Sequence, residues 1–82
     1  MMKSEKIAIA SIYVPVKRRA TLDPAKVTVL AEAILKDGLK TPIMVRKDEA
    51  RYVLVEGLHR LEACKTLGEE KVACYLVQAR RH

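Results

Sequence analysis

The sequence predicts an α/β (α+β) fold, in which a small mixed sheet of about four strands carries two main helices. Segments with β-like and helix-like patterns follow one another in the order strand, helix, strand, strand, helix, strand. The 82 residues suffice for one modest core, so we expect residues 1–82 to form a single domain. With 50% hydrophobic and 32% charged residues, the composition is typical of a folded chain rather than a disordered one.

The first predicted elements are a strand, a loop and a helix. Apolar and polar residues alternate over Lys6–Tyr13, which favours a strand. Pro15 and the basic cluster Lys17–Arg19 are predicted to form a loop. Asp23 and Pro24 then begin a helix, because Asp is a favoured N-cap residue and Pro fits the first helical position.

The buried face of this first helix is predicted from its spacing. Apolar residues recur every three or four positions at Val27, Leu30, Ile34 and Leu35. Gly38 is the expected C-cap, since glycine readily adopts the left-handed conformation that ends many helices.

The second half of the chain is predicted to contain a hairpin, a helix and a final strand. Ile43–Arg46 and Tyr52–Val55 flank a short polar turn and are expected to pair. The second helix covers Leu58–Leu67 and ends at Gly68. Val72–Val77 is apolar throughout, so we expect this strand to lie in mid-sheet with both faces buried.

Charge and composition narrow the choice of partners. Sixteen Lys and Arg residues exceed ten Asp and Glu residues, and the net charge of +6 favours polyanions such as nucleotides or DNA. The alternative is that this charge only keeps the chain soluble. Three Tyr residues, with no Phe or Trp, argue against a stacking surface for single-stranded nucleic acid.

The two cysteines and the apolar segments indicate a cytoplasmic location. Cys64 and Cys74 lack metal-ligand spacing, so we expect buried thiols and no metal site of the protein's own. Free thiols are typical of a reducing cytosol. The sequence shows neither a signal peptide nor an apolar stretch of the roughly 18–20 residues that span a bilayer, so no membrane contact is expected.

The strongest functional signal is the change from β-like to helical sequence at Gly57. Backbone N–H groups at a helix start lack intrahelical partners and lie at the positive end of the helix dipole. His59 and Arg60 add positive charge to that first turn, which predicts an anion site, most naturally for phosphate. If both helix starts meet at one edge of the sheet, Lys26 joins this site.

Other interpretations of these residues stay open. Gly57 is alternatively needed only for the strand-to-helix turn, with Arg60 solvated at the surface. Glu56 is a weak catalytic candidate, and Glu56 or Glu62 could help to hold Mg²⁺ beside bound phosphates. His59 as a general base lacks an orienting carboxylate in the sequence.

Three segments occur in a recognisable order. They are Leu22–Val27, then Asp37–Val45 with the pattern Gly-Leu-x-x-Pro-Ile, and then Gly57–Ala63 with the pattern Gly-x-x-Arg. This ordered set resembles the ParB N-terminal domain and sulfiredoxin superfamily, and it covers the chain from about Ile7 to Val77. The resemblance implies a ParB/sulfiredoxin-like fold.

The resemblance also implies a ligand. In ParB proteins the Gly-x-x-Arg turn holds the triphosphate of CTP, and in sulfiredoxins a Gly-Cys-His-Arg turn holds the phosphates of ATP. By this likeness, nucleotide phosphate would bind to the turn formed by Gly57, Leu58, His59 and Arg60. Lys26 matches a basic residue of sulfiredoxins that reaches the nucleotide. Further basic ligands are matched by region only, at Lys17, Arg18 and Arg19.

The chain also departs from these relatives. Leu58 stands where sulfiredoxins have their catalytic Cys, so sulfiredoxin activity is not expected. Val29 and Ala33 replace hydroxyl side chains that sulfiredoxins offer to the nucleotide, which weakens the case for ATP. Up to His82 we find no helix-turn-helix, no C-terminal dimerisation region and no Glu-Asn-x-x-Arg helix that completes the CTP site.

The sequence therefore predicts a ParB-like regulatory module that binds CTP or ATP, with Mg²⁺ as an accompanying ion. The implied process is plasmid or chromosome partition in bacteria, or other DNA-associated regulation. Two alternatives stay open, a DNA-binding accessory domain and a weak nucleotide hydrolase or phosphotransferase. DNA contacts would come from basic residues of the loop and the tail, Lys17, Arg18, Arg19, Arg80 and Arg81. A homodimer or a partner protein is compatible with each of these functions.

Overall fold

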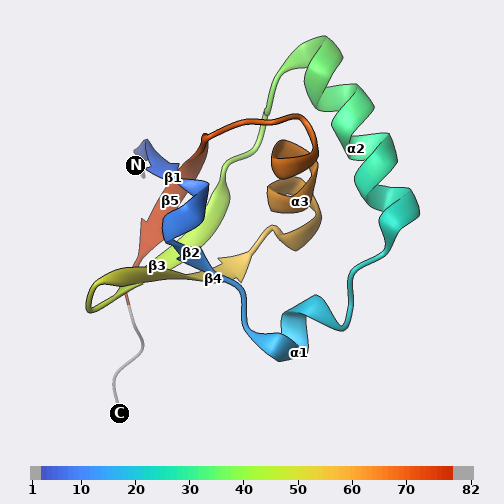
Figure 1. Ribbon diagram of the computed structural model, residues 1–82. Coiled ribbons are helices and arrows are strands. Elements are labelled where there is room, and N and C mark those ends of the chain that lie inside the picture. The colour runs from blue at the N-terminus through green and yellow to red at the C-terminus, as the bar shows by residue number, and fades with distance from the viewer. Residues whose placement is uncertain (1–2, 79–82) are drawn as a thin grey trace.

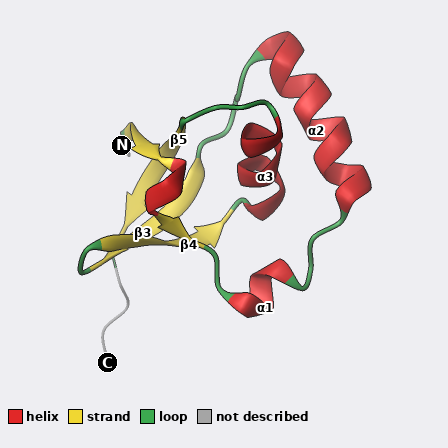
Figure 2. Ribbon diagram, in the orientation of Figure 1, coloured by secondary structure: helices red, strands yellow, loops and turns green. Residues whose placement is uncertain are grey.

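The computed structural model describes residues 3–78 and confirms the predicted α/β fold class. A five-stranded mixed sheet packs against helices that lie on one side of it (Figure 1; Figure 2). The elements in chain order are β1 (Ser4–Ala8), a 3₁₀ turn (Ile9–Ser11), β2 (Ile12–Tyr13), α1 (Val16–Arg19), α2 (Pro24–Asp37), β3 (Ile43–Asp48), β4 (Arg51–Glu56), α3 (Leu58–Thr66) and β5 (Lys71–Val77). In this described part of the chain, no helix has the length and apolar character needed to cross a membrane.

The strand order across the sheet is β1-β5-β3-β4-β2. β3 and β4 form the predicted antiparallel hairpin, while β3 runs parallel to β5. β5 lies inside the sheet as predicted, but the expectation that both of its faces are buried is wrong. Only Val72 and Cys74 are buried, and Leu76 is 42% exposed, because the helices cover a single face.

The first predicted strand, Lys6–Tyr13, is two strands at opposite edges of the sheet. The chain turns between them where the N–H of Ile9 donates to the carbonyl of Glu70 at 2.9 Å. Laid flat, the spacings between β1 and β2 would total about 19 Å, whereas the chain from Ala8 to Ile12 reaches at most about 14 Å. The sheet is therefore curled, which brings its two edges together (Figure 1).

The basic segment that we predicted as a loop contains a single helical turn, α1. Pro15 sets the backbone for this turn, because its fixed φ suits a helix start and its carbonyl accepts from the N–H groups of Arg18 and Arg19. The turn places Lys17, Arg18 and Arg19 at the surface.

The start and the end of α2 confirm the sequence signals. The Asp23 carboxylate accepts from the N–H of Ala25 at 3.0 Å, Pro24 is the first helical residue, and Gly38 ends the helix at φ 81°. The buried face was predicted less well. Val27 is buried and Leu30 and Ile34 are half-buried, but Leu35 is 77% exposed and does not belong to that face.

α3 lies between the sheet and α2 (Figure 1). Its residues Leu61 and Cys64 belong to the main core cluster with the sheet, whereas Ala63 packs with Val27 and Ala31 of α2. α3 is therefore packed on both sides, which positions the turn that begins it at the end of β4.

Candidate functional site

Gly57 forms the turn between β4 and α3, and two features of the structure require glycine there. Its φ is +110°, in the left-handed region that disfavours a side chain. A Cβ at this position would lie 2.6 Å from Cγ2 and 2.8 Å from Cβ of Ile43, which is fully buried. The turn is thus a point of close backbone approach, which explains the glycine on structural grounds alone.

The start of α3 presents free backbone donors. The first intrahelical bond runs from the N–H of Leu61 to the carbonyl of Gly57 at 2.9 Å, so the N–H groups of Leu58, His59 and Arg60 have no acceptor within the helix. No side chain caps this end, and its first turn contains no acidic residue. The Leu58 side chain is buried in the core, so Leu58 offers only its backbone.

His59 joins the two helix starts. Its Nε2 accepts a hydrogen bond from the N–H of Asp23, the N-cap residue of α2, at 3.0 Å. A ring nitrogen that accepts carries no proton, so the proton of a neutral imidazole resides on Nδ1. This hydrogen bond joins the two helix starts, and Lys26 and His59 line one hollow of about 440 Å³, which Arg60 does not line.

Arg60 is held by the segment that leads into β3. Its Nη1 donates to the carbonyls of Thr41 and Pro42, both at 3.0 Å, which uses both hydrogens of that nitrogen. Within residues 3–78 the edge formed by Nε and Nη2 makes no hydrogen bond or ion pair. Arg60 is half-buried, so the alternative that it is merely solvated is wrong.

A second, smaller hollow of about 210 Å³ contains Arg60 and shares a single lining residue with the first. Leu30 borders both, and Ala33 and Thr41 border the smaller one. Val29, whose side chain is 67% exposed, lies on the first. Aliphatic side chains of α2 thus line both hollows. The cations are Lys26, on the same helix, and His59 in the first hollow, and Arg60 and Lys40 in the second, where the Asp37 carboxylate also lies.

The remaining basic candidates that the structure describes line neither of these two hollows. Lys17 and Arg18 are exposed on α1, and Arg19 donates from Nε to the carbonyl of Val14 at 3.2 Å. Arg19 lines a different hollow, together with Leu58 and Glu62. Arg80 and Arg81 lie outside the described residues.

The carboxylates give little support for catalysis. Glu56 is exposed at the end of β4, and Glu62 forms an ion pair with Lys65 at 3.2 Å. Across residues 3–78 there is no group of three or more His, Cys, Asp or Glu side chains placed to hold a metal ion. The described residues therefore offer hydrogen-bond donors for an anion, and no cluster of side chains that could coordinate a metal ion.

Both cysteines are buried, as predicted, and free. Burial raises the pKa of Cys74 to about 11. Burial raises the pKa of Cys64 as well, and the nearby Glu69 carboxylate adds to the effect. Both thiols therefore stay protonated near neutral pH, which makes them poor nucleophiles.

Comparison with known proteins identifies the family. The model of the ParB N-terminal domain matches residues 2–82. The probable chromosome-partitioning protein ParB of Campylobacter jejuni is 32% identical over 62 residues, which are 76% of this chain and 22% of that protein. This chain thus spans about a fifth of the curated relative that it matches.

Solved structures share the fold. Sulfiredoxin from Arabidopsis thaliana superposes with a TM-score of 0.84 at 28% identity, over 94% of this chain and 86% of that one. The C-terminally truncated ParB from Caulobacter crescentus, complexed with CTP-γ-S, gives a TM-score of 0.82 at 23% identity, over 95% and 46% of the two chains. With the match along nearly its whole length, this chain belongs to the ParB N-terminal domain family.

Proposed function

We propose that this chain is a nucleotide-binding regulatory module that holds the phosphates of CTP or ATP at the turn of Gly57, Leu58, His59 and Arg60. The observation that carries the proposal is the junction of two helix starts through the hydrogen bond between Asp23 and His59. This junction brings Lys26 to the uncapped, positive end of α3. The CTP-γ-S complex of the Caulobacter relative supports a nucleotide as the anion.

Each group has a definite part in phosphate binding. The N–H groups of Leu58, His59 and Arg60 donate to one phosphate, as at other helix starts. The free Nε–Nη2 edge of Arg60 is the fork that binds two phosphate oxygens, and the carbonyls of Thr41 and Pro42 hold it in place. Lys26 and the Nδ1–H of His59 add donors from the neighbouring hollow.

Mg²⁺ enters with the nucleotide in this proposal. Magnesium commonly keeps several waters and binds through substrate phosphates and one or two carboxylates rather than a full protein cage. Glu56 is the carboxylate adjacent to the turn, and it is also the candidate residue for weak hydrolysis. Sulfiredoxin chemistry is not proposed, because the side chain of Leu58 is a buried hydrocarbon without a nucleophile.

Isothermal titration with CTP, ATP, GTP and UTP in the presence of Mg²⁺ tests the proposal. We expect one nucleotide to bind, and Lys26→Ala to weaken binding about tenfold through loss of a charge-assisted contact. Lys36→Ala is the matched control, since Lys36 lies on the same helix in its last turn. Arg60→Ala should abolish binding, with its folding checked by thermal melting because Arg60 also holds two carbonyls.

Absence of binding to all four nucleotides, or equal effects of the Lys26 and Lys36 substitutions, would contradict the site. Phosphate release measured with the preferred nucleotide distinguishes a switch from a hydrolase. A hydrolase that uses Glu56 should lose turnover, but not binding, in Glu56→Gln.

A second candidate function, DNA binding, has its own observation. α1 presents three exposed cations on one turn, Lys17, Arg18 and Arg19. If each neutralised one phosphate, log K against log salt would have a slope of about −2.7 for duplex DNA. Replacement of all three by Ala should remove that slope, while nucleotide affinity stays unchanged. A salt-independent affinity for DNA would exclude these contacts.

A further inference from the structure

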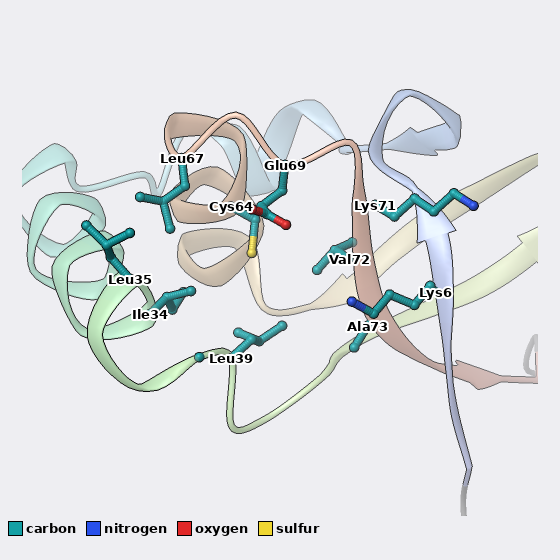
Figure 3. Close-up of a pocket in the computed structure, with 11 residues that line it drawn as sticks. Lys6, Ile34, Leu35, Leu39, Cys64, Leu67, Glu69, Lys71, Val72 and Ala73 are labelled. Carbon is teal, nitrogen blue, oxygen red and sulfur yellow. The ribbon is translucent and has the colours of Figure 1, made fainter.

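Another hollow, of about 450 Å³, lies beside Cys64 and Leu67, at the C-terminal end of α3 (Figure 3). It is bounded by the C-terminal ends of α2 and α3, by the start of β5 and by Lys6 of β1. Its size falls in the range of small-molecule sites, roughly 300–1,000 Å³. None of the phosphate-binding residues proposed above lines it, although Ile34, Gly38 and Leu39 also border the hollow that contains Arg60.

Aliphatic side chains form most of the wall. Ile34, Leu39 and Leu67 are half-buried there, and Val72 forms the side toward the sheet. Leu35 stands at the rim with 77% of its surface exposed. An exposed leucine beside a half-buried aliphatic wall would gain from contact with an apolar ligand, because both surfaces would leave water.

Two opposite charges face this hollow. In Figure 3 the Lys6 amine extends toward it between Leu39 and Val72, and the Glu69 carboxylate lies beside the Cys64 sulfur. The Lys71 amine extends the other way. Within residues 3–78, neither Lys6 nor Glu69 takes part in an ion pair, and neither side chain makes a hydrogen bond.

Both charges lie near enough to the Cys64 thiol to affect its pKa. Glu69 raises its pKa and Lys6 lowers it, in addition to the larger effect of burial. The hollow therefore has a buried thiol in its wall, an ammonium group on one side, a carboxylate on another and aliphatic walls between them.

We propose that this hollow binds a free apolar α-amino acid of the leucine type. The ligand carboxylate pairs with the Lys6 ammonium, the ligand ammonium pairs with the Glu69 carboxylate, and the aliphatic side chain packs between Leu39, Leu67 and Val72. A monofunctional acid or amine would pair with only one of these two exposed charges. A zwitterion with an apolar side chain is complementary to all three parts of the lining.

Titration of the full chain with three related compounds tests this proposal. L-Leucine presents both charges, 4-methylpentanoate only the carboxylate and 3-methylbutylamine only the ammonium. We expect L-leucine to bind roughly tenfold more tightly than either of the others, because each lacks one charge-assisted contact. Methyl NMR of the leucine side chains should place the shifts at Leu35, Leu39 and Leu67.

Two substitutions and their matched controls complete the experiment. Lys6→Met and Glu69→Gln should each weaken L-leucine binding roughly tenfold. Lys71→Met and Glu70→Gln should change it less than twofold, since the Lys71 amine points away and Glu70 lies outside this lining. Equal affinities for the three compounds, no binding at millimolar concentrations, or equal effects of all four substitutions would overturn the proposal. Lys6 and Glu69 line neither hollow of the proposed nucleotide site, so nucleotide titration of the same variants distinguishes a failure of this proposal from a failure of phosphate binding at Gly57.

Discussion

Replacement of Gly57 by Ala tests the geometry on which the phosphate turn depends. Alanine at φ +110° carries the steric cost of the left-handed region, about 1–2 kcal/mol. Its Cβ would also lie 2.6 Å from Cγ2 of Ile43. The Ile43 side chain is fully buried, so the surrounding core limits how far it can shift. Overpacking of this kind costs about 1–3 kcal/mol, so the two effects together predict a loss of about 2–5 kcal/mol.

That loss is large for a chain of this length. At roughly 0.05–0.15 kcal/mol per residue, 82 residues give a total stability of about 4–12 kcal/mol. Urea unfolding followed by circular dichroism measures the change in the free energy of unfolding. Thermal melting of Gly57→Ala should show a correspondingly large drop in Tm.

Gly68 is the matched control for the Gly57 substitution. It has φ +79°, but a Cβ there would meet no heavy atom within 4 Å, so Gly68→Ala should cost only the backbone penalty of about 1–2 kcal/mol. Removing Cγ2 with Ile43→Ala should make the double variant less destabilised than the sum of the single variants. If Gly57→Ala costs no more than Gly68→Ala, the close approach to Ile43 is not present in solution.

Three further predictions concern single residues. Asp23→Ala should lower the free energy of unfolding by about 1 kcal/mol through loss of the cap to Ala25, and an unchanged urea midpoint would disprove that cap. Leu35→Ala should change stability by less than about 0.5 kcal/mol, whereas Leu61→Ala, at 1% exposure, should cost about 2–5 kcal/mol by the same assay. Burial raises the pKa of Cys74 from 9.0 to about 11, so above pH 9 the unfolded chain binds fewer protons than the native one. Stability should therefore fall by up to about 3 kcal/mol between pH 9 and pH 11, and Cys74→Ala should lose that part of the fall in parallel urea titrations.

Local chemistry accounts for the parts of the fold that the sequence predicted well. Asp23 caps α2, Pro24 begins it and Gly38 ends it, as their backbone preferences indicate. The β3–β4 hairpin also follows from two short β-like runs around a polar turn. In each case the residues that decide the structure are neighbours in the chain.

The wrong predictions of strand extent and burial concern features that depend on residues distant in the sequence. The alternation over Lys6–Tyr13 contains no sign of the turn at Ile9, whose partner is the carbonyl of Glu70. The apolar run Val72–Val77 predicts a strand buried on both faces, but burial depends on which face the helices cover. Leu35 fits the helical spacing, yet α2 packs mainly on α3, and this narrow contact leaves Leu35 outside it.

The candidate site likewise has residues that the sequence predicted and partners that it did not. Gly57 and the cations that follow it are visible in the sequence, and the meeting of Lys26 with His59 followed from the expected topology. The carbonyls of Thr41 and Pro42 were not predicted, because every residue has a carbonyl and no side chain marks these two as partners of Arg60. The N–H of Asp23, which fixes His59, was missed for the same reason.

The most direct test of the phosphate site is an NMR titration of the ¹⁵N-labelled chain with its preferred nucleotide and Mg²⁺. The largest amide shifts should occur at Leu58, His59 and Arg60, whose N–H groups lie at the open start of α3, with smaller shifts at Lys26. Shifts confined to α1, or a spectrum that does not change, would contradict phosphate binding at this turn.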